Sequence, residues 1–227
     1  MEFLTGVKEK ETVSVSEILS GDYVGKTVKM NGAVHNIRDM GEFAFVILRK
    51  AEGLVQCVYE DGKTDLDLKE LKEESAVEVT GVVALEERAP QGFELRLTGI
   101  RVLSQPAETM PIAINKWKMN TSLETRLSLR PVSLRNVRER AKFKIQEGIV
   151  RGFREFLSSQ GFTEVHTPKI VSRGAEGGAN VFKLNYFNKK AELGQSPQFY
   201  KQMMVGVFDR VFEVAPVFRA EKHNTTR

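Results

Sequence analysis

Residues 43–59 read FAFVILRKAEGLVQCVY. The stretch contains two short apolar runs, residues 43–48 and 54–59, separated by a charged break that ends in Glu52 and Gly53. β-Branched and aromatic residues are enriched in strands, and a short glycine-containing break between two such runs is typical of a hairpin. The stretch therefore predicts a β-hairpin.

The sequence on both sides of this hairpin also favours strands. Phe93, Leu95 and Leu97 alternate with other residues, as on a half-buried strand. Between the later strands, the charged residues 65–74 include three leucines and suit a short helix. Three strands, a short helix and two strands form the element order of an OB-fold, a five-stranded barrel that often binds oligonucleotides. We expect this barrel to span residues 13–104, with strands at residues 24–37, 43–48, 54–59, 76–85 and 93–103.

A different pattern begins after the predicted barrel. Residues 105–135 contain Pro106, Pro111 and Pro131 and few signals of regular structure, so we interpret them as a linker. From Asn136 onward, apolar residues recur at three- and four-residue steps, which is the pattern of one face of a long helix.

The predicted long helix is followed by short strands and helices. Asn136 is suited to cap the start of the helix, and Gly161 is suited to end it. We expect strands at residues 162–171, 181–187 and 210–219 and a helix near residues 197–205. The whole chain is therefore predicted to be α+β: a five-stranded OB-fold barrel followed, over residues 136–227, by a domain with a largely antiparallel sheet.

The composition is that of a folded protein with an uneven charge. The chain has 227 residues and a net charge of +4, but residues 1–106 carry −6 and the rest +10. This asymmetry favours two modules with different functions. Cys57 is the only cysteine, so no intrachain disulfide is possible, and we expect a reducing, cytoplasmic environment. No apolar run suits a signal peptide or a membrane span.

Two polar segments in the second half could bind a small anionic ligand. Arg219 and Glu221 lie two residues apart at the end of the predicted strand, where they could grip a phosphate and accept a bond from an amino group. Gln198 and Lys201 share a helical face and suit a carboxylate. Taken alone, a surface ion pair and a solvated helix face are the better interpretations. No CxxC, HExxH, Walker or GxGxxG pattern occurs, so a metal site made by this chain is not expected.

One strand of the predicted hairpin could face an unpaired base. Phe43 and Phe45 are two residues apart and point to the same face. Burial of both rings in the core is the usual outcome. If Phe45 is exposed, however, it offers a stacking surface, with Arg38 and Gln56 beside it to read base edges.

Four segments, in this order, resemble the class II aminoacyl-tRNA synthetases of the aspartyl, asparaginyl and lysyl subgroup. GFTEVHTPKI (161–170) is similar to the first motif of that class, with Pro168 as its proline in the dimer motif, and VFEVAPVFRAEKHNTTR (211–227) is similar to the second. AEGGANVF (175–182) and QSPQFYKQ (195–202) are similar to segments of the aspartyl branch. Asparaginyl members usually differ where this chain has QSPQ, so the resemblance favours aspartate over asparagine.

The resemblance implies a role for individual residues. Arg219 matches the arginine that contacts the ATP α-phosphate and the amino-acid carboxylate during catalysis. The positions that match ATP contacts are Arg219, Ala220, Glu221 and Arg227. The positions that match the aspartate pocket are Glu176, Ser196, Gln198, Lys201 and Arg219, with Lys201 neutralising the side-chain carboxylate. The positions that match anticodon contacts are Arg38, Phe45 and Gln56.

Two further positions bear on the choice of tRNA. Members that charge only their own tRNA tend to have Trp where this chain has His35 and Lys where it has Pro90. His35 and Pro90 are the residues of relaxed members, which implies aspartylation of tRNA-Asn as well as tRNA-Asp. The test is the charging of purified tRNA-Asn.

The family resemblance also implies ligands and partners beyond the residues in hand. It implies ATP, Mg²⁺, L-aspartate and a homodimer, and the Mg²⁺ ligands are expected after Arg227, where family members continue. We therefore expect that residues 1–227 alone do not aminoacylate. The alternatives are a truncated relative that binds RNA through the barrel without making an adenylate and, less favoured, an asparaginyl enzyme.

Overall fold

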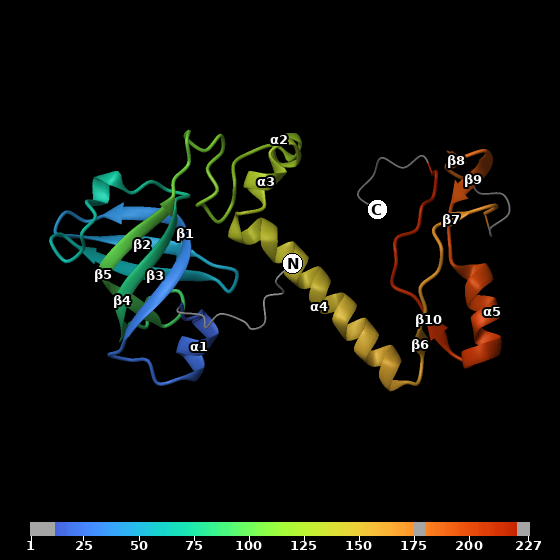
Figure 1. The fold of residues 1–227 in the computed structure, drawn as a ribbon, viewed down its shortest axis with the longest axis horizontal. Helices are drawn as coiled ribbons and strands as arrows, with labels where there is room; N and C mark the ends of the chain where they lie inside the picture. The colour runs from blue at the N-terminus through green and yellow to red at the C-terminus, as the bar shows by residue number, and fades with distance from the viewer. Residues whose placement is uncertain (1–11, 175–179, 222–227) are drawn as a thin grey trace, which may run out of the picture. The chain divides into compact units, whose positions relative to one another are not determined.

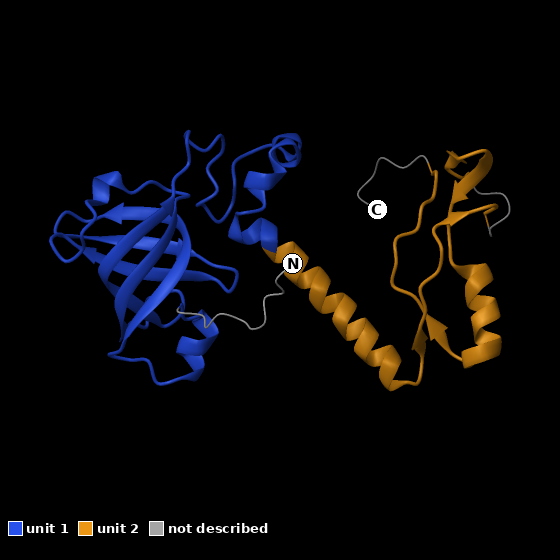
Figure 2. Ribbon diagram, viewed as in Figure 1, with its two compact units in different colours: residues 1–140 blue, residues 141–227 orange. Residues whose placement is uncertain are grey.

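The structure is a computed structural model that describes residues 12–174 and 180–221. The chain divides into two compact units, residues 1–140 and 141–227 (Figure 2). No helix within these described ranges is long and apolar enough to cross a membrane.

The first unit contains a closed five-stranded barrel (Figure 1). The order around the barrel is β1-β2-β3-β5-β4. All neighbours pair antiparallel except β3 and β5, which are parallel. This topology confirms the predicted OB-fold barrel. The strands are β1 (Thr27–Asp39), β2 (Phe43–Arg49), β3 (Leu54–Glu60), β4 (Ala76–Leu85) and β5 (Phe93–Ser104).

Alternation of apolar side chains closes the barrel around one core. Along β3 and β4 every second residue is buried, because successive side chains point to opposite faces of a strand. The fully inaccessible side chains at the centre of the core include Met30, Val34, Val46, Leu48, Val55, Val77, Val79 and Leu95.

Two short helices accompany the barrel. Helix α1 (Val15–Ser20) begins with a capping box between Ser14 and Glu17, and the Glu52 carboxylate accepts a hydrogen bond of 2.9 Å from the N–H of Val15. This helix was not predicted. The short helix expected within residues 65–74 is a single 3₁₀ turn, η1 (Leu68–Glu70), whose first residues are held by the Asp67 carboxylate.

The segment expected to be a linker packs in the same unit as the barrel. It contains α2 (Leu123–Ser128), α3 (Arg130–Ser133) and a small core of Ile112, Ile114 and Met119. The Asn136 amide donates hydrogen bonds to the carbonyls of Ile114 (2.9 Å) and Lys116 (2.7 Å). Residues 105–135 are therefore folded against their neighbours rather than extended as a plain connection.

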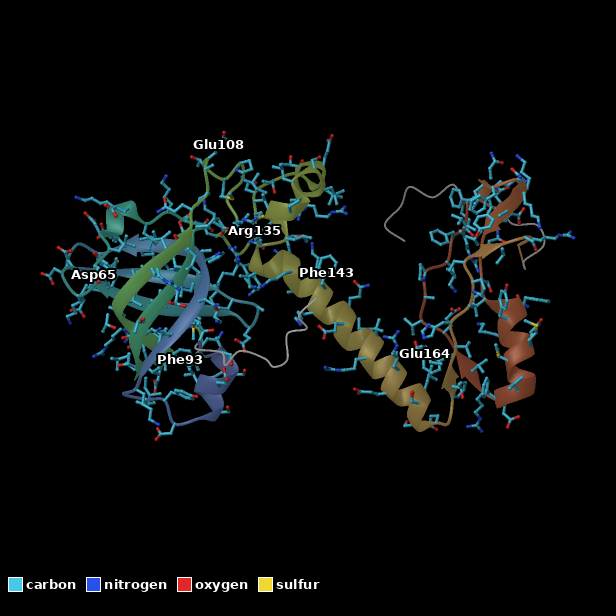
Figure 3. The ribbon with its side chains drawn as sticks, viewed as in Figure 1. Asp65, Phe93, Glu108, Arg135, Phe143 and Glu164 are labelled. Atoms are coloured by element: carbon cyan, nitrogen blue, oxygen red, sulfur yellow. The ribbon has the colours of Figure 1, made fainter. Side chains whose placement is uncertain are left out.

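A long helix, α4 (Val137–Ser159), passes from the first unit into the second. The side-chain Oδ1 of Asn136 accepts hydrogen bonds from the N–H groups of Arg138 and Glu139, and Gly161 adopts a φ of 77°, so both predicted helix ends are confirmed. No residue of α4 is buried. Its exposed apolar side chains include Phe143 (Figure 3), Ile145, Ile149, Phe153 and Phe156.

The described residues of the second unit form two small sheets and one further helix. A three-stranded antiparallel sheet has the order β7-β9-β8, and β10 pairs with β6 in parallel. The predicted strand at residues 210–219 is wrong in its extent, because only its start pairs as β10. Pro216 lacks an N–H group and does not fit a continuous ladder. The elements are β6 (Thr163–Glu164), β7 (Ile170–Val171), β8 (Lys183–Tyr186), β9 (Lys189–Leu193), α5 (Gln198–Phe208) and β10 (Val211–Phe212).

Candidate functional site

The three predicted base-reading residues share the outer face of the barrel. Arg38 on β1 lies directly opposite Phe45 on β2. Gln56 on β3 lies opposite Ile47, which is two residues from Phe45 on the same strand and so points to the same side. The register also sets Gln56 beside Glu94 on β5. The barrel thus gathers these side chains from four neighbouring strands.

An aromatic pair forms part of this face. Phe45 is half-buried and Phe43 is 36% exposed, so neither ring lies in the core. The ring centroids are 5.2 Å apart with an interplanar angle of 87°, which is an edge-to-face contact. The usual outcome for two alternating phenylalanines, burial of both, does not hold here. The pair offers a surface on which a flat ring can stack.

Glu94 is a member of this face that the sequence reasoning missed. The Glu94 side chain is 10% exposed. Its carboxylate accepts a hydrogen bond of 3.2 Å from the Gln56 amide and lies 3.5 Å from the Arg96 guanidinium. The bond fixes which end of the Gln56 amide faces the carboxylate, because only the NH₂ group can donate. A signal was present, since the inward alternation of Phe93 and Leu95 places Glu94 outward.

His35 lies in a buried, charged neighbourhood instead. It occupies an irregularity of β1 between Val34 and Asn36 and is 5% exposed. Burial and the nearby Arg49 guanidinium, 3.3 Å from Nδ1, lower the pKa of His35. The second residue predicted to affect tRNA choice, Pro90, is exposed in the turn between β4 and β5.

Glu74 is the centre of the charged group around His35. Its side chain is 3% exposed and receives two bonds from Arg49 and one of 2.9 Å from Arg135 (labelled in Figure 3). Burial would raise the pKa of Glu74, but the two guanidinium groups outweigh it and lower the pKa. A cavity of about 540 Å³, lined by His35, Glu74 and residues 106–114, adjoins this group.

In the second unit, two predicted aspartate-binding residues line one cavity. Ser196 and Gln198 border a space of about 410 Å³ together with Gly174 and Gly194. The Ser196 hydroxyl accepts a bond of 3.1 Å from the N–H of Gln198, which helps to start α5. Lys201 lies in the first turn of α5 but not in the lining of this cavity. Glu176 lies outside the described residues.

The predicted nucleotide-binding residues follow the extended segment after β10. Arg219 and Glu221 lie 3.9 Å apart, and about half of each side chain is exposed. An accessible guanidinium suits a phosphate, so the residues present fit a nucleotide. Ala220 donates its N–H to the carbonyl of Asn180 at 3.2 Å. Arg227 is not among the described residues. Residues 12–174 and 180–221 contain no group of three His, Cys, Asp or Glu side chains able to hold a metal ion.

The residues around Pro168 are bonded to the same extended segment. Pro168 is exposed, but its neighbours Thr167 and Lys169 both contact Glu213, whose side chain is 2% exposed. The Glu213 carboxylate accepts a hydrogen bond of 2.7 Å from the N–H of Thr167 and lies 2.9 Å from the Lys169 ammonium. Burial would raise the pKa of Glu213, but the contacts with Thr167 and Lys169 outweigh it and lower the pKa. Arg154 on α4 similarly pairs with Glu164 on β6 at 2.9 Å (Figure 3).

Two family models match the chain. Residues 28–103 match the OB-fold nucleic acid binding domain, and residues 122–227 match the class II tRNA synthetases (D, K and N). Residues 122–227 are therefore similar to part of the class II tRNA synthetases. The two matches follow one another along the chain, in the order of the barrel and the Arg219-bearing unit.

Curated relatives agree with both matches. An aspartate–tRNA(Asp/Asn) ligase of Deinococcus radiodurans is 51% identical over 203 residues, which are 89% of this chain and 45% of that protein. The aspartate–tRNA(Asp/Asn) ligase of Archaeoglobus fulgidus is 43% identical over 208 residues, 89% of this chain and 48% of that protein. The chain spans about half the length of the curated relatives it matches.

Solved structures resemble the chain in both units. An asparaginyl-tRNA synthetase from Pyrococcus horikoshii complexed with asparaginyl-adenylate has a TM-score of 0.80 and 34% identity, covering 90% of this chain and 47% of its own. A putative aspartyl-tRNA synthetase from Leishmania major Friedlin has a TM-score of 0.77 and 33% identity, covering 99% of this chain and 47% of its own. These likenesses support an α+β fold with an OB-fold barrel and part of a class II catalytic domain.

Proposed function

We propose that this chain forms the anticodon-binding barrel and the first half of the catalytic domain of an aspartate–tRNA ligase. One observation carries the proposal: a single chain joins an outer barrel face with an accessible aromatic pair to a class II synthetase segment that ends in the exposed Arg219 and Glu221. The names and the 42–51% identities of the curated relatives support it.

The proposed reaction has two steps. A carboxylate oxygen of aspartate attacks the α-phosphorus of ATP in line, a P–O bond forms, and pyrophosphate leaves with the electrons of the broken P–O bond. A ribose hydroxyl of the terminal adenosine of tRNA then attacks the aspartyl carbonyl and AMP leaves. Arg219 neutralises charge at the α-phosphate, and positioning of the reactants supplies much of the remaining rate. Mg²⁺, when bound, would neutralise phosphate charge.

Selection of aspartate is assigned to the start of α5. Lys201 carries a positive charge that favours a carboxylate over the neutral amide of asparagine. Ser196 and Gln198, which line the cavity of about 410 Å³, would contact the remainder of the amino acid. Glu176 would bind the α-amino group.

The test of this function is aspartate-dependent exchange of pyrophosphate into ATP by a full-length polypeptide that contains this chain. Exchange with aspartate but not with asparagine supports the proposal, and charging of purified tRNA-Asp and tRNA-Asn separates a relaxed enzyme from a strict one. Exchange with asparagine instead would identify the asparaginyl alternative. No exchange with either amino acid would contradict the proposal.

Recognition of the anticodon is assigned to the outer face of the barrel. We expect Phe45→Ala to weaken binding of a tRNA-Asp anticodon hairpin by about 5- to 150-fold, since stacking on an aromatic ring is worth about 1–3 kcal/mol per base. Leu19→Ala, an exposed apolar truncation on α1, is the control and should bind like the original chain. Equal affinities of the two variants for the hairpin would show that Phe45 does not contact the anticodon.

A second function is favoured by one feature, the completeness of the barrel core. Because the core of the first unit is fully closed, the barrel has the structure needed to bind RNA without any adenylate chemistry. An RNA-binding relative without synthetase activity would bind the hairpin, depend on Phe45 and show no pyrophosphate exchange in any full-length form.

A further inference from the structure

Gln195 is a buried polar side chain at a meeting point of three segments of the second unit. It follows β9 and directly precedes Ser196, and its exposed fraction is 1%. Fully buried glutamines are uncommon, because each amide must find partners for both its donor and its acceptor groups. The contacts of Gln195 therefore require a reason.

The amide nitrogen of Gln195 is connected to the backbone beside Arg219. Nε2 donates a hydrogen bond of 3.1 Å to the carbonyl of Asn180. The same carbonyl accepts a bond of 3.2 Å from the N–H of Ala220, the residue after Arg219. One carbonyl oxygen thus joins the Gln195 side chain to the segment from which Arg219 projects.

The backbone next to Gln195 holds the same segment at a second point. The carbonyl of Gly194 accepts a hydrogen bond of 3.0 Å from the N–H of Phe218. The N–H of Gly194 donates a hydrogen bond of 2.8 Å to the carbonyl of Lys169. The extended segment is therefore held on both sides of Arg219, at Phe218 directly and at Ala220 through Asn180. Since residues 213–220 lack strand pairing, these two bonds define the path of the segment more than a ladder does.

The orientation of the Gln195 amide follows from its acceptor. If the amide were reversed, Oε1 would face the Asn180 carbonyl, and two acceptors cannot bond to each other. Oε1 instead lies near Gly174, where an added Cβ would come within 3.1 Å of it, and it has no hydrogen-bond partner among the described residues. The chain thus keeps a buried amide with one unused acceptor, although an apolar side chain of that volume would fill the space.

We propose that Gln195 is a positioning residue for Arg219. Its N–H group fixes the Asn180 carbonyl, which fixes the N–H of Ala220 and with it the direction in which the Arg219 guanidinium projects. The inference rests on the proposed function, in which that guanidinium neutralises the α-phosphate. Gln195 itself touches neither substrate.

The first test is Gln195→Leu in the full-length ligase, a substitution that preserves the approximate volume and removes the donor. Misplacing a catalytic group by about 1 Å can cost about 100-fold in rate, so we expect kcat for pyrophosphate exchange to fall by about 10- to 100-fold. The KM for aspartate and the Tm should change little. Gln160→Leu, at an exposed position after α4, is the control and should match the wild-type enzyme.

The second test is the pH profile of Gln195→Glu, which distinguishes positioning from simple filling of space. An ionised glutamate cannot donate to the Asn180 carbonyl, but a protonated one can. Burial and the nearby Glu192 carboxylate, which accepts a bond from Gly174, should raise the pKa of the introduced acid. The Lys169 ammonium, on the segment whose carbonyl accepts the Gly194 N–H, is already paired with Glu213. The activity of Q195E relative to the wild-type enzyme should therefore recover as the pH falls from 8 to 6.

Clear outcomes separate this inference from the proposed function. A wild-type ligase without aspartate-dependent exchange contradicts the function itself. With an active wild-type enzyme, wild-type kcat in folded Q195L overturns the positioning role. If Q195L does not fold, the profile of Q195E decides: a relative activity that does not change with pH overturns the inference, and recovery at low pH supports it.

Discussion

The two units of the chain differ in how far they bury their apolar side chains. Among the described residues, 18 buried side chains form one continuous core in the first unit. In the second unit the buried apolar side chains are Val165, Ala191 and Phe212, each with 6–8% exposure. The difference is not one of composition, because α4 and α5 are rich in apolar residues that are exposed in this structure.

This contrast teaches that the two units have different degrees of independence. A closed barrel satisfies its backbone hydrogen bonds and leaves no sheet edge, so its stability is contained within residues 12–140. An exposed apolar face on a helix, by contrast, gains its stability only when something covers it. The following predictions test this contrast in order of decreasing effect.

Separating the two units should have the largest effect. We expect residues 12–140 to fold alone with a cooperative thermal transition, because the barrel, α1 and the small core of Ile112, Ile114 and Met119 lie in this part. Residues 141–227 alone should show no cooperative transition, since they bury few apolar side chains. Circular dichroism during heating measures both. A cooperative transition in the second piece would contradict the contrast.

A pair of phenylalanine truncations tests the difference in apolar burial between the two units. Phe93, 2% exposed at the start of β5, packs into the barrel core, and Phe93→Ala should lower the free energy of unfolding by about 3–5 kcal/mol. Phe143 on α4 is 56% exposed, and Phe143→Ala should change it by less than about 0.5 kcal/mol. Urea denaturation of the whole chain measures both. Equal losses would mean that the α4 face is covered in solution.

Removing a buried carboxylate should cost somewhat less. Glu74→Ala leaves Arg49 with a buried, uncompensated charge, and loss of one partner of a buried pair costs about 3 kcal/mol. Glu60→Ala, which breaks an exposed pair with Lys63, is the control and should cost less than about 1 kcal/mol. Urea denaturation of residues 12–140 measures both values.

The pH dependence of the Glu74 contribution has a defined sign. Because the folded-state pKa of Glu74 is lowered from its ordinary value of 4.5, the stabilisation is present above about pH 4.5 and is lost as the pH falls through the lower, folded-state pKa. The difference between the original chain and E74A should therefore narrow on acidification. A difference that is constant from pH 7 to pH 3 would show that the carboxylate charge does not contribute.

The sequence predicted the barrel well because its signals are local. Strands β2, β3, β4 and β5 begin and end within one or two residues of the expected positions, since alternation and turn residues define them directly. The ends of α4 were predicted for the same reason, from Asn136 and Gly161. In the second unit, β8 lies within the expected strand at residues 181–187, but β6 and β7 are only the two ends of the expected strand at residues 162–171. Two-residue ladders between distant segments leave no period in the sequence, so these extents were not predicted.

The candidate sites were predictable in part. Phe45, Arg38 and Gln56 could be placed on one barrel face because strand register follows from a hairpin. Glu74, Glu213 and Gln195 were missed, because their functions depend on partners 15 or more residues away that no spacing rule predicts. The burial of His35 was missed because an irregularity of β1 interrupts the alternation there.

The smallest effect that we predict concerns His35, the only histidine in residues 12–140. Burial, Arg49 and Arg140 lower its pKa, while Glu74 opposes them. The unfolded chain therefore takes up a proton near its ordinary pKa of 6.5 that the folded barrel does not take up. The contribution of the neutral His35 ring to the free energy of unfolding should be fully present above that value. The free energy of unfolding should then decline as the pH falls from 7 to 5, by at most about 1.4 kcal/mol per pH unit for one proton.

Two measurements test this prediction on residues 12–140. An NMR titration should give His35 a midpoint below 6.5, and His35→Phe should flatten the decline in unfolding free energy between pH 7 and pH 5 relative to the original piece. An unchanged slope in His35→Phe would assign the decline to other groups and would mean that the buried ring is not kept neutral by its surroundings. A flattened slope would show that burial and the neighbouring Arg49 keep the His35 ring neutral in the folded barrel over this pH range.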